Sequence, residues 1–125
     1  SVDLYGTILR GLKQVADTGS KTTKALIKLL RHKNHDVVAK VADCMAGYEG
    51  ASGKVRKELL EELIKQTEGV FQAAENKDKN AERKWNIIRT KVIAALNALS
   101  GQQFKDPAAA RSWFNDNKKD KDLWK

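Results

Sequence analysis

The chain has 125 residues, of which 41% are hydrophobic and 32% are charged. This length suits one domain with a continuous core, and the apolar share is too high for a disordered chain. Lysine and arginine outnumber aspartate and glutamate by 24 to 16, which gives a net charge of +8. Nucleic acid, anionic lipid and acidic proteins are therefore electrostatically favoured partners.

The cysteine and methionine content and the lengths of the apolar runs limit the kinds of protein that this chain can be. Cys44 is the only cysteine, so an internal disulfide is excluded. No run of 18 apolar residues occurs, so no membrane-spanning helix is predicted. The chain begins with Ser1 and its single methionine is Met45, from which we expect a processed or truncated product.

Apolar residues recur every three or four positions along most of the chain, a spacing that predicts helices. The first three predicted helices cover Val2–Thr18, Lys21–Arg31 and His35–Tyr48. Ser20 is the expected cap of the second, and glycines at 47, 50 and 53 indicate a turn after the third. The sequence contains one proline and no alternating run of strand length, so the predicted class is all-α.

The C-terminal half continues this pattern. A fourth helix is predicted to begin near Ser52 and to end between Gly69 and Asn76, followed by a polar loop over 75–80. A fifth runs from about residue 81 to residue 100, where Gly101 can end it in the left-handed conformation. Asp106 and Pro107 indicate the start of a sixth, which we expect to form a hairpin with the fifth. Residues 115–125 are expected to fray, unless Leu123 and Trp124 fold back onto the domain.

The helical spacing also predicts the core. The residues expected there are Leu59, Leu63, Trp85, Ile88, Val92 and Leu96, with Cys44 as a small buried residue.

The fifth predicted helix carries Ile88-Arg89, Val92-Ile93 and Ala95-Leu96 and resembles the first helix of a HEAT repeat, V-R-x-x-A-A-x-A-L. Residues 37–45 resemble it again, and residues 99–104 with Trp113-Phe114 resemble the last module of bacterial HEAT-repeat proteins. The resemblance implies about six helices in three stacked antiparallel hairpins, a right-handed α-solenoid over residues 1–118 with a charged tail at 119–125. The alternative is an irregular helical bundle that shares only the apolar spacing.

Basic residues supply the candidate binding site. Lys21, Lys24, Lys28 and Arg31 are spaced to share one stripe of a helix, and a second basic group lies about the fifth helix. Four cations on one face can bind phosphates, although such a stripe is also what a solvated face looks like. The residues predicted to make electrostatic contacts are Lys24, Lys28, Arg31, Arg83 and Lys84.

The sequence contains only weak patterns for metal binding or catalysis. His32, His35 and Asp36 could hold zinc, but no second cluster supplies further ligands, so we expect no metal and no cofactor. Trp85, Trp113 and Asp116 are the residue types that act on an extruded base, yet Trp85 belongs to the core stripe. The resemblance to HEAT repeats implies a non-enzymatic scaffold, and we expect it to bind a protein partner. The alternative is a nucleic-acid-binding helical domain that uses its basic helix faces.

Overall fold

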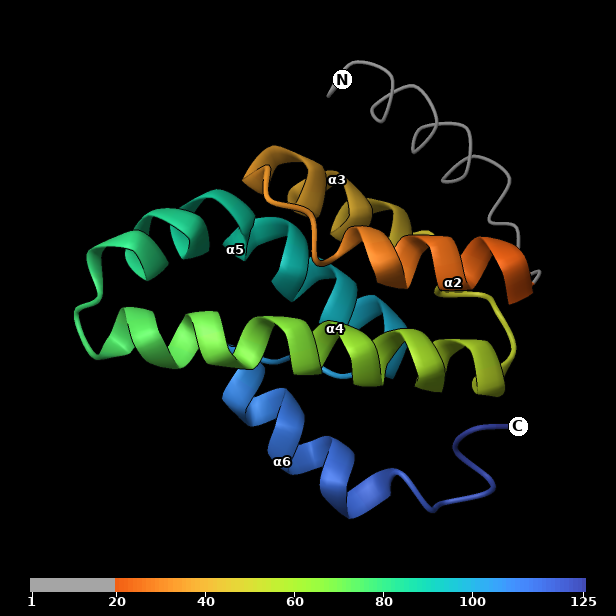
Figure 1. Cartoon of the computed structure of the whole chain (residues 1–125). Coiled ribbons are helices and arrows are strands. Elements are labelled where there is room, and N and C mark those ends of the chain that lie inside the picture. Colours follow the sequence, from red (N-terminus) through yellow and green to blue (C-terminus); the bar gives the residue numbers. More distant parts are fainter. Residues whose placement is uncertain (1–19) are drawn as a thin grey trace.

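A computed structural model describes residues 20–125 of the chain. Within these residues the chain forms five helices and no β-strand, which confirms the all-α prediction (Figure 1). The helices are α2 (Ser20–Leu29), α3 (His35–Ala46), α4 (Gly53–Glu75), α5 (Lys79–Ser100) and α6 (Pro107–Asn117). The first predicted helix, Val2–Thr18, lies outside the described residues.

Side chains at the helix starts provide the capping hydrogen bonds that the sequence indicates. Asp106 caps α6 by accepting a hydrogen bond from the backbone N–H of Ala109 at 2.8 Å, with Pro107 as the first helical residue. Ser52 caps α4 in the same way, and Gly101 ends α5 with φ 74°. These ends were predictable because each cap is a local interaction between residues a few positions apart.

Three predicted boundaries were wrong by two residues. α2 ends at Leu29 and α3 at Ala46, both before their expected ends. α5 begins at Lys79, so the loop predicted over 75–80 shrinks to residues 76–78. The reason is that Asp78 caps α5, accepting a hydrogen bond from the N–H of Ala81 at 3.0 Å.

The short turn between α4 and α5 places Lys77 in the left-handed region with φ 69°. The N–H of Lys77 donates to the carbonyl of Ala74, and the N–H of Asp78 donates to that of Ala73, each at 3.0 Å. This pair of bonds is the Schellman motif, which usually has glycine at the left-handed position. A lysine there bears a steric cost that glycine does not.

Replacing Lys77 with glycine is therefore expected to stabilise the protein by about 0.5–1 kcal/mol, because relief of the backbone strain outweighs the added freedom of the unfolded chain. Urea denaturation followed by circular dichroism measures the change. Lys79→Gly is the matched control and should destabilise, since Lys79 is a helical residue of α5. A loss of stability in Lys77→Gly would contradict the strain argument.

The helices pack so that α5 lies against both α3 and α4, while α4 also contacts α2 and α6 (Figure 1). The predicted hairpin of the fifth and sixth helices is not the main pairing, because α6 packs chiefly on α4 and only slightly on α5. The buried residues Ala110 and Phe114 lie on α6, and Arg111 of the same helix forms an ion pair with Glu68 of α4. Nε and Nη2 of Arg111 each donate to a Glu68 carboxylate oxygen at 3.0 Å, and these bonds raise the pKa of Arg111.

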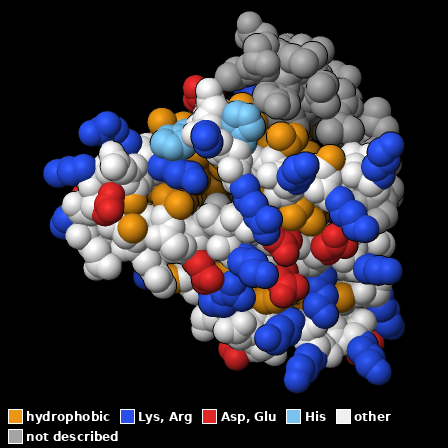
Figure 2. Space-filling model, in the orientation of Figure 1, with side chains coloured by type: hydrophobic (Ala, Val, Ile, Leu, Met, Phe, Trp, Pro, Cys, Tyr) orange, Lys and Arg blue, Asp and Glu red, His pale blue; other side chains and the backbone are white. Residues whose placement is uncertain are grey.

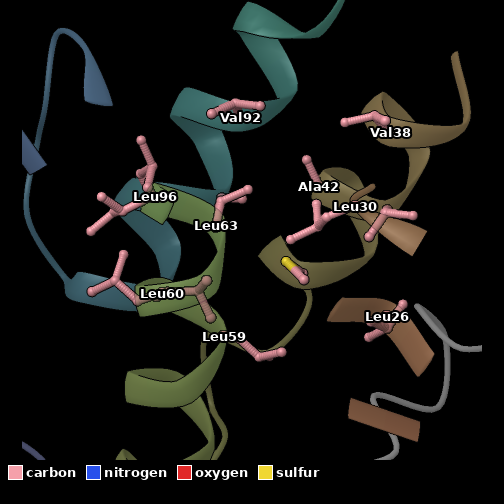
Figure 3. Packing of buried hydrophobic residues seen from close by; sticks show 14 of the residues in the cluster. Leu26, Leu30, Val38, Ala42, Leu59, Leu60, Leu63, Val92 and Leu96 are labelled. Carbon is pink, nitrogen blue, oxygen red and sulfur yellow. The ribbon is translucent and has the colours of Figure 1, made fainter. Parts of the chain in front are cut away.

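The core lies where α2, α3, α4 and α5 meet, and Figure 3 shows Leu26, Ala42, Leu63 and Leu96 among the side chains that converge there. All six residues predicted for the core are buried, with Trp85 the most exposed of them at 7%. Cys44 is buried too, as expected. The helical periodicity therefore identified the apolar faces correctly.

The fraying expected over residues 115–125 was wrong: α6 continues to Asn117, and the segment after it folds back onto the start of α4, the exception that the sequence allowed (Figure 1). The backbone N–H of Gly53 donates to the carbonyl of Lys125 at 2.9 Å. Trp124 donates from Nε1 to the carbonyl of Asn117 at 3.0 Å and packs against the rings of Trp113 and Phe114. The domain boundary expected at residue 118 stays a prediction.

Candidate functional site

The predicted cations of the second helix lie at the surface. Lys24 and Lys28 are exposed on α2, whereas Arg31 is exposed in the turn beyond the end of this helix. A hollow of about 630 Å³ lies beside them, lined by Ala25, Lys28, Leu29, Arg31 and His32. The hollow therefore combines two cations with apolar side chains.

The other two predicted residues are at a different place. Arg83 is exposed and Lys84 half-buried in the first turns of α5, at the end of the molecule where α4 and α5 are joined (Figure 1). α2 lies toward the other end of α4 in the same view. The structure thus separates the five predicted contact residues into two groups and does not bring them together.

A third basic group, which the sequence analysis missed, lies around the start of α4. A hollow of about 670 Å³ is lined by Lys54, Lys57, Lys118, Lys119, Asp120, Lys121 and Trp124. Figure 2 shows basic side chains gathered at the lower right, over the region where Figure 1 places the start of α4 and the C-terminal segment. We call this site the lysine hollow.

Local hydrogen bonds shape the C-terminal wall of the lysine hollow. After α6 ends at Asn117, the carboxylate Oδ1 of Asp120 accepts from the backbone N–H groups of Asp122 and Leu123, at 3.0 and 3.3 Å. The N–H of Asp120 itself donates to the carbonyl of Asn117 at 3.0 Å. The resulting turn carries three lysines and directs the chain toward Trp124.

Arg56 connects this wall to the helices. Its Nε donates to the carbonyl of Ala51 at 3.1 Å, and its Nη1 donates to the carbonyl of Leu99, in the last turn of α5, at 3.2 Å. Its guanidinium carbon lies 5.7 Å from the centre of the Trp124 ring. Arg56 thus contacts three segments that meet at this end of the molecule.

The only sequence signal for the lysine hollow was the cluster of lysines at 118, 119 and 121 together with Trp124. Such a cluster at the end of a chain is usually solvated, and Lys54 and Lys57 are far from it in the sequence. The hollow exists because Trp124 lies against Gly53, a contact between residues that no local pattern relates.

The remaining chemical hypotheses gain no support from the geometry. Among residues 20–125, no three His, Cys, Asp or Glu side chains are close enough together to form a metal site. His32 has a structural role in the loop before α3, where its Nδ1 accepts a hydrogen bond from the N–H of Asn34 at 3.0 Å. None of the described helices combines the length and apolar character that crossing a membrane requires.

Comparisons of the chain with protein-family models, with curated proteins and with solved structures find no match.

Proposed function

We propose that this chain is a non-enzymatic interaction module whose helices stack as in a HEAT-type α-solenoid. The observation that carries the proposal is the order of packing: α2 contacts α4, α4 contacts α6, and α3 contacts α5. Helices two positions apart in the chain thus lie against each other, as in solenoids, where each hairpin stacks on its neighbours. Stacked helical layers of this kind present long exposed faces to partner macromolecules.

The partner we favour is a protein that contacts the exposed side of α2. The hollow beside this helix includes Leu29 and Ala25 as well as Lys28 and Arg31. Protein interfaces characteristically surround an apolar centre with polar and charged groups. An apolar side chain flanked by carboxylates is the ligand that this hollow suits best.

The experiment is affinity capture with the purified protein as bait, from a nuclease-treated extract of the source cells. We expect a protein retained in stoichiometric amount, and its loss when Lys24, Lys28 and Arg31 are replaced with glutamate. Arg83→Glu with Lys84→Glu is the control for the second basic group, and it should keep the partner. A second capture uses an extract that has not been treated with nuclease. If the bait retained nucleic acid there and no protein in either extract, the result would contradict a protein scaffold.

Nucleic-acid binding is the second candidate, and the lysine hollow is the specific observation that favours it. Five lysines and one aspartate line this hollow, whereas the described residues that line the hollow beside α2 include only Lys28 and Arg31 as lysine or arginine side chains. Such a concentration of charge attracts polyanions and loses its attraction as salt screens it.

A further inference from the structure

The lysine hollow joins two segments that are distant in the sequence. Lys54 and Lys57 come from the first turns of α4, while Lys118, Lys119 and Lys121 come from the chain beyond α6. Like charges repel, so gathering five of them costs free energy that a bound anion would offset. The arrangement is therefore best matched to a ligand with several negative charges.

The segments that carry these lysines are fixed with respect to each other. The position that a Cβ of Gly53 would take is occupied by the backbone of Trp124, and Gly53 donates its N–H to Lys125. Arg56 adds a contact with the Trp124 ring. Because the two walls are held in place, their lysines act as one site rather than as independent surface charges.

The start of α4 adds a second electrostatic argument. The positive end of a helix dipole usually has acidic side chains nearby, yet the first turn of α4 contains none and carries Lys54 instead. A cation at this end is repelled by the positive end of the dipole. A bound anion would be stabilised by the lysines and by the positive end of the helix dipole, whereas the N–H groups of Gly53 and Val55 already donate to Lys125 and Ser52.

The shape of the hollow indicates what kind of polyanion fits. It is open to solvent, whereas sites for small molecules usually bury most of the ligand. Half-buried Trp124 lines one wall, and an indole there can stack only on a base that is free of duplex pairing. Lysines for the phosphates and an aromatic ring for a base are the two components of single-strand binding sites.

We propose that the lysine hollow binds the phosphate backbone of a single-stranded nucleic acid, with a base against Trp124. This site is separate from the α2 surface assigned to the protein partner, and its failure would leave that assignment untouched. The strand contacts the walls of the hollow through Lys54, Lys57, Lys118, Lys119 and Lys121.

Fluorescence anisotropy of a labelled single-stranded 12-mer tests the charge of the site, at about 50 and 200 mM salt. Replacing Lys118, Lys119 and Lys121 with glutamine should weaken binding at least tenfold and reduce the salt slope by about two, since three phosphate contacts are lost. The control replaces Lys24, Lys28 and Arg31 with glutamine, which removes the same charge from α2, and should change the affinity less than twofold.

Gly53→Ala tests the geometry of the site, because it displaces the Trp124 wall while every lysine remains. Single-strand binding should weaken about as much as in the lysine variant, whereas Gly69→Ala, whose Cβ would meet no neighbour within 4 Å, should leave it unchanged. The matching duplex should bind more weakly than the single strand, and triphosphate nucleotide or polyglutamate should compete poorly.

Several results would overturn the proposal. Absence of single-strand binding at the lower salt, or equal losses in the α2 and C-terminal lysine variants, would mean that the hollow is not a nucleic-acid site. Full affinity in Gly53→Ala would mean that the lysines act independently. Tighter binding of duplex would remove the role of Trp124, and equal competition by nucleotide or polyglutamate would assign the hollow to a small phosphate ligand or an acidic protein.

Discussion

Replacing Trp85 with alanine is expected to lower the free energy of unfolding by about 3–5 kcal/mol, the largest effect of any single change considered for this chain. Trp85 is 7% exposed and lies on α5 where this helix faces the C-terminal half of α4. Its ring meets that of Phe71 edge to face, with centroids 5.4 Å apart and planes at 66°. Alanine would remove both the buried area and the ring contact, and would leave a cavity.

Urea denaturation monitored by circular dichroism is the appropriate measurement, because the substitution itself alters tryptophan fluorescence. Ile87→Ala is the matched control: Ile87 is two residues away on the same helix but 47% exposed, so its loss should cost less than about 0.5 kcal/mol. If the two variants were equally stable, Trp85 would not be a core residue and the pairing of α4 with α5 would be in doubt.

The second large effect is expected at Gly53, where alanine should destabilise the protein by about 2 kcal/mol. The new methyl group would occupy the space that the backbone of Trp124 takes, so the C-terminal segment has to move away. Its departure exposes the Trp124 ring and breaks the hydrogen bond between Gly53 and Lys125. The loss of apolar burial outweighs the gain of about 0.5–1 kcal/mol that alanine brings to a helix.

Urea denaturation measures the stability of Gly53→Ala, and hydrogen exchange at residues 118–125 reports whether the segment has moved. Gly69→Ala is the control from the same helix, with an exposed glycine and open space around its Cβ position. It should stabilise by about 0.5–1 kcal/mol. Equal stabilisation by both substitutions, with unchanged exchange at the C-terminal end, would show that Trp124 does not pack against Gly53.

The parts of this fold that were predictable from sequence depend on neighbouring residues. The cap at Asp106, the stop at Gly101 and the buried face through Ile88 and Val92 each follow from spacings of a few positions. The packing of α6 on α4 could not be predicted from such local spacings. It arises from the ion pair between Arg111 and Glu68 and from packing between distant segments.

The candidate site was less accessible to sequence reasoning than the fold. From the sequence, Gly53 is indistinguishable from Gly50, since both occur in a turn rich in glycine. Only the tertiary structure shows that Gly53 leaves space for the chain end. A Cβ at Gly50 would meet no atom within 4 Å among residues 20–125 other than its chain neighbours. The stripe of Lys24 and Lys28 was visible because helical spacing is local, whereas the lysine hollow required the fold-back.

The three-residue turn between α4 and α5 has a consequence for the order of folding. Closing so short a connection costs little chain entropy, and helix pairs built on local contacts form quickly. The two longest described helices, of 23 and 22 residues, are therefore expected to pair early and to serve as the nucleus on which α3 and α6 assemble. Docking of residue 125 at residue 53 closes a much longer loop, so the lysine hollow should be among the last parts of the molecule to form.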